Sequence, residues 1–187
     1  IYLFKASVNI KSFIGRKSMT YDGATKELLK LNHKKIHALW KIVKTGNLNG
    51  LSGEDKWLAK VMWEHQDKYF NQFEMADLTH DREYDVDSGE NPFLHISFHV
   101  IVERQLEAKD PIEVYQFYNS MRNKKYPRHD TIHLIAVILT PLMFQVIQER
   151  REFDLDNYRV LLRKYKNRKP SKIYESLEKD LDALFQK

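Results

Sequence analysis

Cysteine is absent from this chain of 187 residues, so neither disulfide bonds nor thiolate metal ligands can form. Any metal must therefore be bound by histidine, aspartate or glutamate side chains. No apolar run approaches the ~20 residues that a membrane-spanning helix needs, and the longest, over residues 134–139, suits a buried helix. With 42% hydrophobic and 30% charged residues, the composition is typical of a soluble globular protein. We expect no membrane contact and a cytoplasmic location.

The chain also lacks a convincing strand pattern, and apolar residues at helical spacing dominate it. This spacing predicts a helix over residues 24–43. Ser52 and Asp55 resemble a capping box, and they predict a second helix whose apolar stripe continues over residues 57–73. Residues 75–91 read as a polar loop.

Proline and capping residues mark the remaining helix starts. The expected helices run from Asn91-Pro92 to about Ala108, from Asp110-Pro111 to about Lys124, and from about Arg128 to Arg151 after Pro127, with a kink at Pro141, followed by two C-terminal helices capped by Asp154 and Ser171.

These elements predict an all-α protein. We expect an up-and-down helical bundle of four core helices plus additional C-terminal helices, in a single domain over residues 19–187. Residues 1–18 contain four basic and no acidic side chains. We expect them to be an N-terminal extension, either translated sequence ahead of Met19 or a presequence.

Histidine is the residue whose placement stands out. Six of the eight histidines form pairs four residues apart, a spacing that brings two imidazoles to one face of a helix. The pair His33 and His37 flanks two lysines, and solvated side chains explain it. The other two pairs, with His65 on an apolar stripe, predict a metal site between helices. The expected ligands are His65, His95, His99, Glu103, His129 and His133.

The sequence leaves open both the role of Glu103 and the identity of the metal. His95 and Glu103 lie ~12 Å apart along a helix, so either two ions are bound or Glu103 orients an imidazole. Asp130, between His129 and His133, is expected to orient a ligand or move a proton. Nitrogen and carboxylate ligands suit a divalent transition metal, and iron, zinc, manganese and nickel are not distinguished.

The stretch Asn91-Pro92-Phe93-Leu94-His95, followed by His99, Glu103 and Gln105, resembles a bacterial family called domain of unknown function 1841. The resemblance covers about residues 55–150. It implies a paired-histidine motif, here His129-Asp130-x-x-His133, and an upstream element, here His65 to Tyr69. Tyr69 stands where the family has its second histidine, so the resemblance places it beside the ligands. The pattern is similar to haemerythrin and DinB bundles by analogy of fold alone.

A second class of function is a binding module in which the histidines are structural. Basic residues gather in the C-terminal part of the chain, where they could follow a nucleic-acid backbone or contact an acidic protein. The sequence also leaves open whether the protein forms a homodimer and whether it is an enzyme. A bound metal could activate water or bind a gas, or the site could sense or store the metal or tie helices together. The basic residues are Arg159, Arg163, Lys164, Lys166, Arg168 and Lys169.

Overall fold

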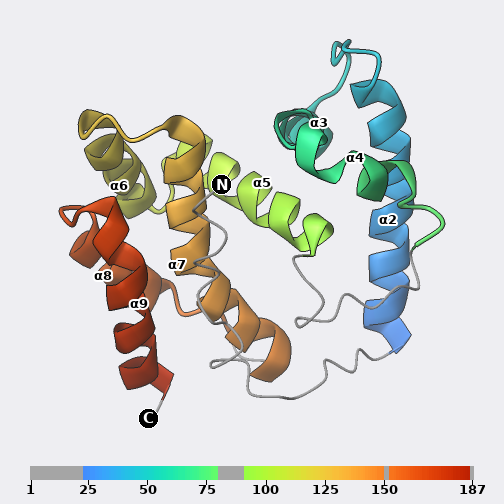
Figure 1. Ribbon diagram of the computed structural model, residues 1–187. Coiled ribbons are helices and arrows are strands. Elements are labelled where there is room, and N and C mark those ends of the chain that lie inside the picture. Colours follow the sequence, from blue (N-terminus) through green and yellow to red (C-terminus); the bar gives the residue numbers. More distant parts are fainter. Residues whose placement is uncertain (1–22, 80–90, 150–151, 186–187) are drawn as a thin grey trace. The chain divides into compact units, whose positions relative to one another are not determined.

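Every regular element in the described residues, which are 23–79, 91–149 and 152–185, is an α-helix in this computed structural model (Figure 1). The all-α prediction is therefore confirmed for the part of the chain that the structure describes. None of these helices combines the length and apolar character that crossing a membrane requires. The helices are α2 (Gly23–Val43), α3 (Gly53–Glu64), α4 (Gln66–Glu74), α5 (Pro92–Ala108), α6 (Ile112–Asn123), α7 (Arg128–Glu149), α8 (Leu155–Tyr165) and α9 (Pro170–Phe185).

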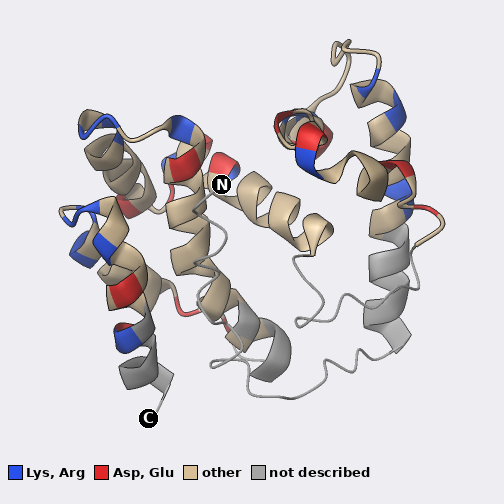
Figure 2. Cartoon of the chain, in the orientation of Figure 1, with Lys and Arg blue, Asp and Glu red and all other residues tan. Residues whose placement is uncertain are grey.

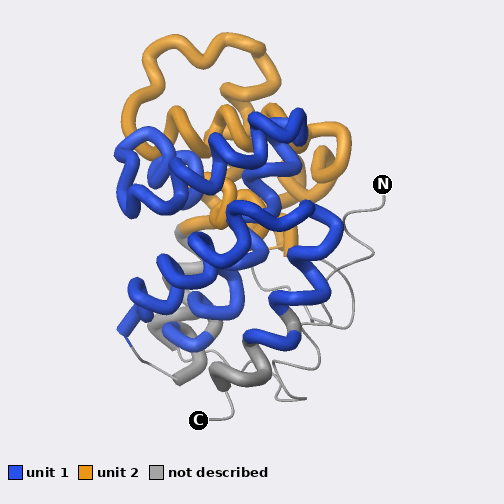
Figure 3. Tube along the Cα trace, turned by 90° about the vertical axis from the view of Figure 1, so that its left-hand side faces the viewer, with its two compact units in different colours: residues 1–16, 101–187 blue, residues 17–100 orange. Residues whose placement is uncertain are grey.

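The chain divides into two compact units (Figure 3). We call the described residues up to Val100 the N-terminal unit and those from Ile101 onward the C-terminal unit. Helix α5 contributes residues to both. The expectation of one domain over residues 19–187 stays a prediction, and the N-terminal extension lies outside the described residues.

The N-terminal unit packs α2 against α3 and α4 around an aromatic and aliphatic core. This core also takes side chains from the first turns of α5, among them Phe93 and Ile96. Burying side chains of this size contributes roughly 1.5–3 kcal/mol each to folding, so this core is the main source of the unit's stability. Its largest fully buried members are Trp40, Phe73, Ile36 and Met62.

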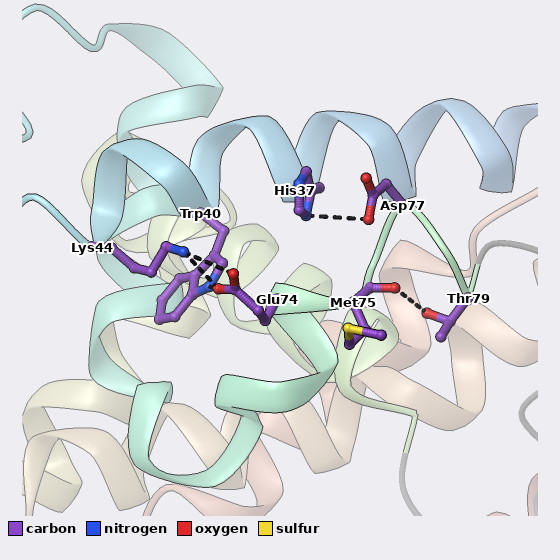
Figure 4. A network of polar contacts seen from close by, with 7 residues as sticks. All are labelled: His37, Trp40, Lys44, Glu74, Met75, Asp77 and Thr79. Atoms are coloured by element: carbon purple, nitrogen blue, oxygen red, sulfur yellow. Dashed lines mark hydrogen bonds and ion pairs between the residues drawn. The ribbon is translucent and has the colours of Figure 1, made fainter.

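A polar network ties the end of α4 to α2 at the edge of this core (Figure 4). The indole N–H of Trp40 donates to the Glu74 carboxylate at 2.7 Å, and Lys44 Nζ donates to both oxygens of Glu74 at 2.9 and 2.7 Å. Nearby, His37 Nδ1 lies 3.4 Å from the Asp77 carboxylate. These contacts fix where α4 ends relative to α2.

The C-terminal unit packs α7 against α6, α8 and α9. Its core is the apolar side of α7, including Ile132, Leu134 and Ile138, together with Phe117 of α6 and two buried tyrosines of α8. Pro141 lies inside α7, as expected for this helix. Burial raises the pKa of Tyr158, whose hydroxyl donates to Gln105 at 3.0 Å.

The capping signals were partly correct. Asn91 caps α5, because its side-chain oxygen accepts from the backbone N–H of Phe93 and of Leu94, each at 3.0 Å. Asp154 likewise caps α8 by accepting from Asn157 N at 2.9 Å. The polar residues Asn91 and Asp154 therefore correctly identified the starts of two helices, α5 and α8.

Three other capping predictions were wrong. Ser52 precedes α3 but its side chain makes no capping hydrogen bond. Pro111 has extended backbone angles, so it is itself the N-cap and α6 begins one residue later than Asp110-Pro111 predicted. Ser171 lies inside α9, which already begins at Pro170 because proline is well suited to a first helical position.

Candidate metal centre

His65 occupies a break between two helices. The sequence predicted one continuous helix here, but α3 ends at Glu64 and α4 begins at Gln66. With φ −113° and ψ 6°, His65 is both the C-cap of α3 and the N-cap of α4. The single-helix prediction was wrong because an apolar stripe does not reveal a change of direction between two short helices that face the same core.

Three imidazole rings meet in the N-terminal unit. The ring of His65 lies 4.8 Å from that of His95 and 4.5 Å from that of His99, measured between centroids. The rings of His95 and His99 lie 4.6 Å apart, one turn from each other on α5. His65 is 5% exposed, His99 is 1% exposed and His95 is half-buried. We call these three residues the histidine triad.

The contacts of His65 define which of its ring nitrogens faces the triad. Its Nδ1 lies 2.7 Å from the backbone carbonyl oxygen of Val61. A carbonyl oxygen can only accept, so Nδ1 carries the proton and Nε2 of the neutral ring keeps its lone pair. Nε2 lies 2.9 Å from Nε2 of His95. Val61 could not be predicted from the sequence, because the contact uses its backbone rather than its side chain.

Tyr69 packs beside the triad. Its ring is stacked on His65 with centroids 6.1 Å apart and meets His95 edge-on at 5.5 Å. The side chain is buried, and Lys68 Nζ lies 4.9 Å from the centre of the ring. Tyr69 thus packs against two of the three triad rings, and its predicted place beside metal ligands stays a prediction.

The C-terminal unit carries the second predicted histidine pair. His129 and His133 lie in the first two turns of α7, and their ring centroids are 4.5 Å apart. Both are half-buried. The spacing of four residues therefore brings these two rings together on one helix, as it does for His95 and His99.

Glu103 is engaged by an arginine that the sequence reasoning did not consider. Its carboxylate accepts from Arg128 Nη2 at 2.5 Å, and only 3% of Glu103 is exposed. This ion pair joins α5 to the first residue of α7, directly before His129. A buried carboxylate needs a cationic or metal partner. Arg128, directly before His129, was the signal in the sequence that could have identified this partner.

The remaining histidines and Asp130 lie in other surroundings. His33 is buried, with its ring 4.0 Å from that of Phe93, so the solvated interpretation of His33 was wrong. His33 lies on the same face of α2 as Ile36 and Trp40, which belong to the core of the N-terminal unit. Asp130 lies near Tyr126. Burial raises the pKa of Tyr126, and the negative charge of Asp130 raises it further.

The basic residues that carried the alternative function are distributed between two surroundings. Arg163 Nη1 lies 3.0 Å from Glu113, and Arg159 Nε lies 3.7 Å from the same carboxylate. Lys164 Nζ lies 2.6 Å from Asp180, whose pKa is lowered by hydrogen bonds from Lys164 and Tyr165 that outweigh its partial burial. The other three, Lys166, Arg168 and Lys169, lie beyond the end of α8.

Four histidines of this set, His65, His99, His129 and His133, each offer a ring nitrogen, and such a group could hold a metal ion. Neutral imidazole is the commonest metal ligand in proteins, and partial or complete burial keeps competing water away. The chemistry of the donors therefore suits a transition metal rather than calcium or magnesium, which prefer oxygen.

Comparison with known proteins gives one family. Residues 33–164 match the family described as Domain of unknown function (DUF1841). The match covers well over half of the chain, so the chain belongs to this family, over a longer stretch than the motifs alone indicated. No curated protein and no solved structure matches the chain.

Proposed function

We propose that this protein binds a divalent transition-metal ion through imidazole nitrogens, with His65 and His99 as its central ligands. The observation that carries the proposal is the histidine triad, in which three rings from two separate elements lie with centroids within 4.8 Å of one another. Three imidazoles need three sets of hydrogen-bonding partners when they are buried for packing alone, whereas a single ion satisfies all three lone pairs at once.

The distance between His65 and His95 supports this interpretation. Two nitrogens that bind one ion at about 2.1 Å lie about 3.0 Å apart at a right angle and about 3.4 Å apart at the tetrahedral angle. The Nε2 atoms of His65 and His95 lie 2.9 Å apart. This spacing is compatible with two ligands of one ion, and it does not distinguish iron, zinc, manganese and nickel. Without an ion, the same contact is a hydrogen bond that Nε2–H of His95 donates to His65.

The Val61 carbonyl has the role that an orienting partner has in known metal sites. Metal-bound histidines usually donate their other ring N–H to a carbonyl or carboxylate, which fixes the ring and selects the nitrogen that binds. The 2.7 Å contact from His65 Nδ1 to Val61 does this from one turn earlier in α3. Nε2 of His65 is therefore the atom that we assign as the ligand.

We further propose that His129 and His133 complete the coordination. Within the C-terminal unit, the ion pair between Glu103 and Arg128 joins α5 to the start of α7. Arg128 directly precedes His129. Together with the triad, His129 and His133 would make five imidazole ligands and leave one position on a six-coordinate ion for water or a small ligand, as catalytic and gas-binding centres require.

The test is metal loading of the tag-free protein with Fe²⁺, Mn²⁺, Ni²⁺ and Zn²⁺ in turn, under anaerobic conditions for iron. Elemental analysis after desalting should give about one ion per chain for at least one of these metals. His99→Ala should lower the affinity at least ~100-fold, because removing a ligand costs more than removing an orienting partner, for which 10–100-fold is typical. His133→Ala should weaken binding in the same direction.

The matched control is His37→Ala, which removes an imidazole of the same unit that faces Asp77 rather than the triad. It should leave the stoichiometry and affinity unchanged. Absence of stoichiometric metal from the wild-type protein under all four conditions would contradict the proposal. Full retention in His133→Ala with loss in His99→Ala would confine the site to the histidine triad and refute the part assigned to α7.

A further inference from the structure

Two turns of the C-terminal unit lie against each other at one end of the helices. The turn after α6 and the turn after α8 are joined by Lys124, whose Nζ donates to the backbone carbonyls of Lys166 at 2.7 Å and Arg168 at 3.0 Å. Ser120 Oγ also donates to the Lys166 carbonyl. Residues 122–126 and 166–169, which we call the basic turns, therefore form one continuous surface within this unit.

The basic turns concentrate positive charge without acidic neighbours in the sequence. Residues 114–129 and residues 157–174 contain no aspartate or glutamate. Figure 2 shows Lys and Arg gathered at these turns. The described hydrogen bonds of these six side chains go to carbonyls, an amide and a hydroxyl, and Arg168 also lies over the ring of Tyr165 and acts electrostatically on Asp180. The six are Arg122, Lys124, Lys125, Lys166, Arg168 and Lys169.

The neighbouring basic residues of α8 differ in this respect. Arg163 faces Glu113, Lys164 faces Asp180, and Arg159 lies near both Glu113 and Asp156, so each of the three has a carboxylate partner within the unit. Burial lowers the pKa of Lys124, which holds the two turns together by its contacts with carbonyls. The excess positive charge therefore lies at the turns rather than on the α8 face. There Lys166, Arg168 and Lys169 lie beside three basic residues of a second segment, residues 122–126.

A phosphate backbone is the polyanion that fits this surface. Several neighbouring cations can neutralise successive phosphates, and Lys and Arg side chains bind phosphates without recognising the base sequence. Binding of unpaired bases would need exposed aromatic rings for stacking. Tyr165 beside these turns is fully buried and Tyr126 is half-buried, so neither offers a fully exposed ring. The surface therefore suits a duplex rather than a single strand.

We propose that the basic turns bind the phosphate backbone of double-stranded nucleic acid without sequence specificity. This inference is independent of the metal site, since it uses residues of the α6–α7 and α8–α9 turns alone. The basic turns replace the α8 face as the expected contact surface, because three of the six residues predicted there form ion pairs with Glu113, Asp156 and Asp180.

The experiment is fluorescence anisotropy with a labelled 20-base-pair DNA duplex of mixed sequence, measured from 50 to 200 mM salt. We expect the logarithm of the association constant to fall with the logarithm of salt concentration at a slope of about −5, the value for six phosphate contacts. The variant Lys125→Glu/Lys169→Glu should reduce the magnitude of this slope by about 2 and weaken binding ~10–100-fold.

The matched control is Lys34→Glu/Lys41→Glu, which changes the net charge equally on exposed positions of α2. It should keep the slope of the wild-type protein. Circular dichroism should give the same helix content for both variants, because all four positions are exposed. No binding at 50 mM salt, or equal weakening by the control, would overturn the proposal. Tighter binding of a single strand of equal length, or of a polyglutamate peptide, would overturn the assignment to a duplex.

Discussion

The two units hold their histidines in different ways. In the N-terminal unit, three rings from a helix break and a separate helix meet, and one of them is fixed by the Val61 carbonyl. In the C-terminal unit, two rings lie on a single helix, and the polar contact next to them is the Glu103–Arg128 ion pair. Rings on one helix are placed by spacing alone, whereas rings from separate elements need tertiary packing. The histidine triad therefore depends on the folded core, and the α7 pair depends mainly on α7.

The largest expected effects come from truncating one core phenylalanine in each unit. Phe73 and Phe117 are both fully buried, so Phe73→Ala and Phe117→Ala should each lower the free energy of unfolding by about 3–5 kcal/mol. Urea denaturation followed by circular dichroism measures this loss.

The same experiment tests whether the units unfold together. All three tryptophans, Trp40, Trp57 and Trp63, lie in the N-terminal unit, so their fluorescence reports that unit alone. If the chain is a single cooperative domain, Phe117→Ala should shift fluorescence and circular dichroism to the same midpoint. A fluorescence midpoint that stays at the wild-type value would instead make the units separate domains.

An intermediate effect is expected from Glu103→Gln. The substitution keeps the shape of the side chain but leaves Arg128 without its carboxylate, which should cost about 1–3 kcal/mol. If His129 and His133, which follow Arg128, contribute to the proposed metal site, metal affinity should also fall 10–100-fold. Metal titration and thermal unfolding on the same samples separate the two effects. A variant that is less stable but binds metal normally would show that the triad works without α7.

The smallest effect is expected from Glu74→Gln in the network of Figure 4. The hydrogen bond from Lys44, and then that from Trp40, lowers the pKa of Glu74 below its ordinary value of 4.5. A lowered pKa means that the carboxylate stabilises the fold above pH 4.5 and that this contribution is lost as the pH falls through the folded-state pKa. The variant should melt slightly below wild type at pH 7 and equally once the pH lies below the folded-state pKa of Glu74. A difference that persists unchanged at low pH would contradict the ionic origin.

The sequence predicted the helices well where periodicity and capping agreed, as for α5 after Asn91 and α8 after Asp154. It missed the break at His65, because an apolar stripe continues through a bend whose two sides face the same core. The pairs His95–His99 and His129–His133 followed from spacing within a helix. The Val61 carbonyl and the joining of the basic turns by Lys124 could not be predicted, because both depend on backbone atoms whose positions only the fold determines.

The position of His65 between α3 and α4 has a consequence for how a bound ion would be accommodated. A ligand inside a continuous helix can redirect its side chain only by changing rotamer. A residue at the break between two helices also moves when the angle between those helices changes. A small adjustment of that angle would lengthen or shorten one metal–nitrogen bond while leaving His95 and His99 in place on α5. The site could thus accept ions of different radius by bending its backbone at one residue, without repacking the core.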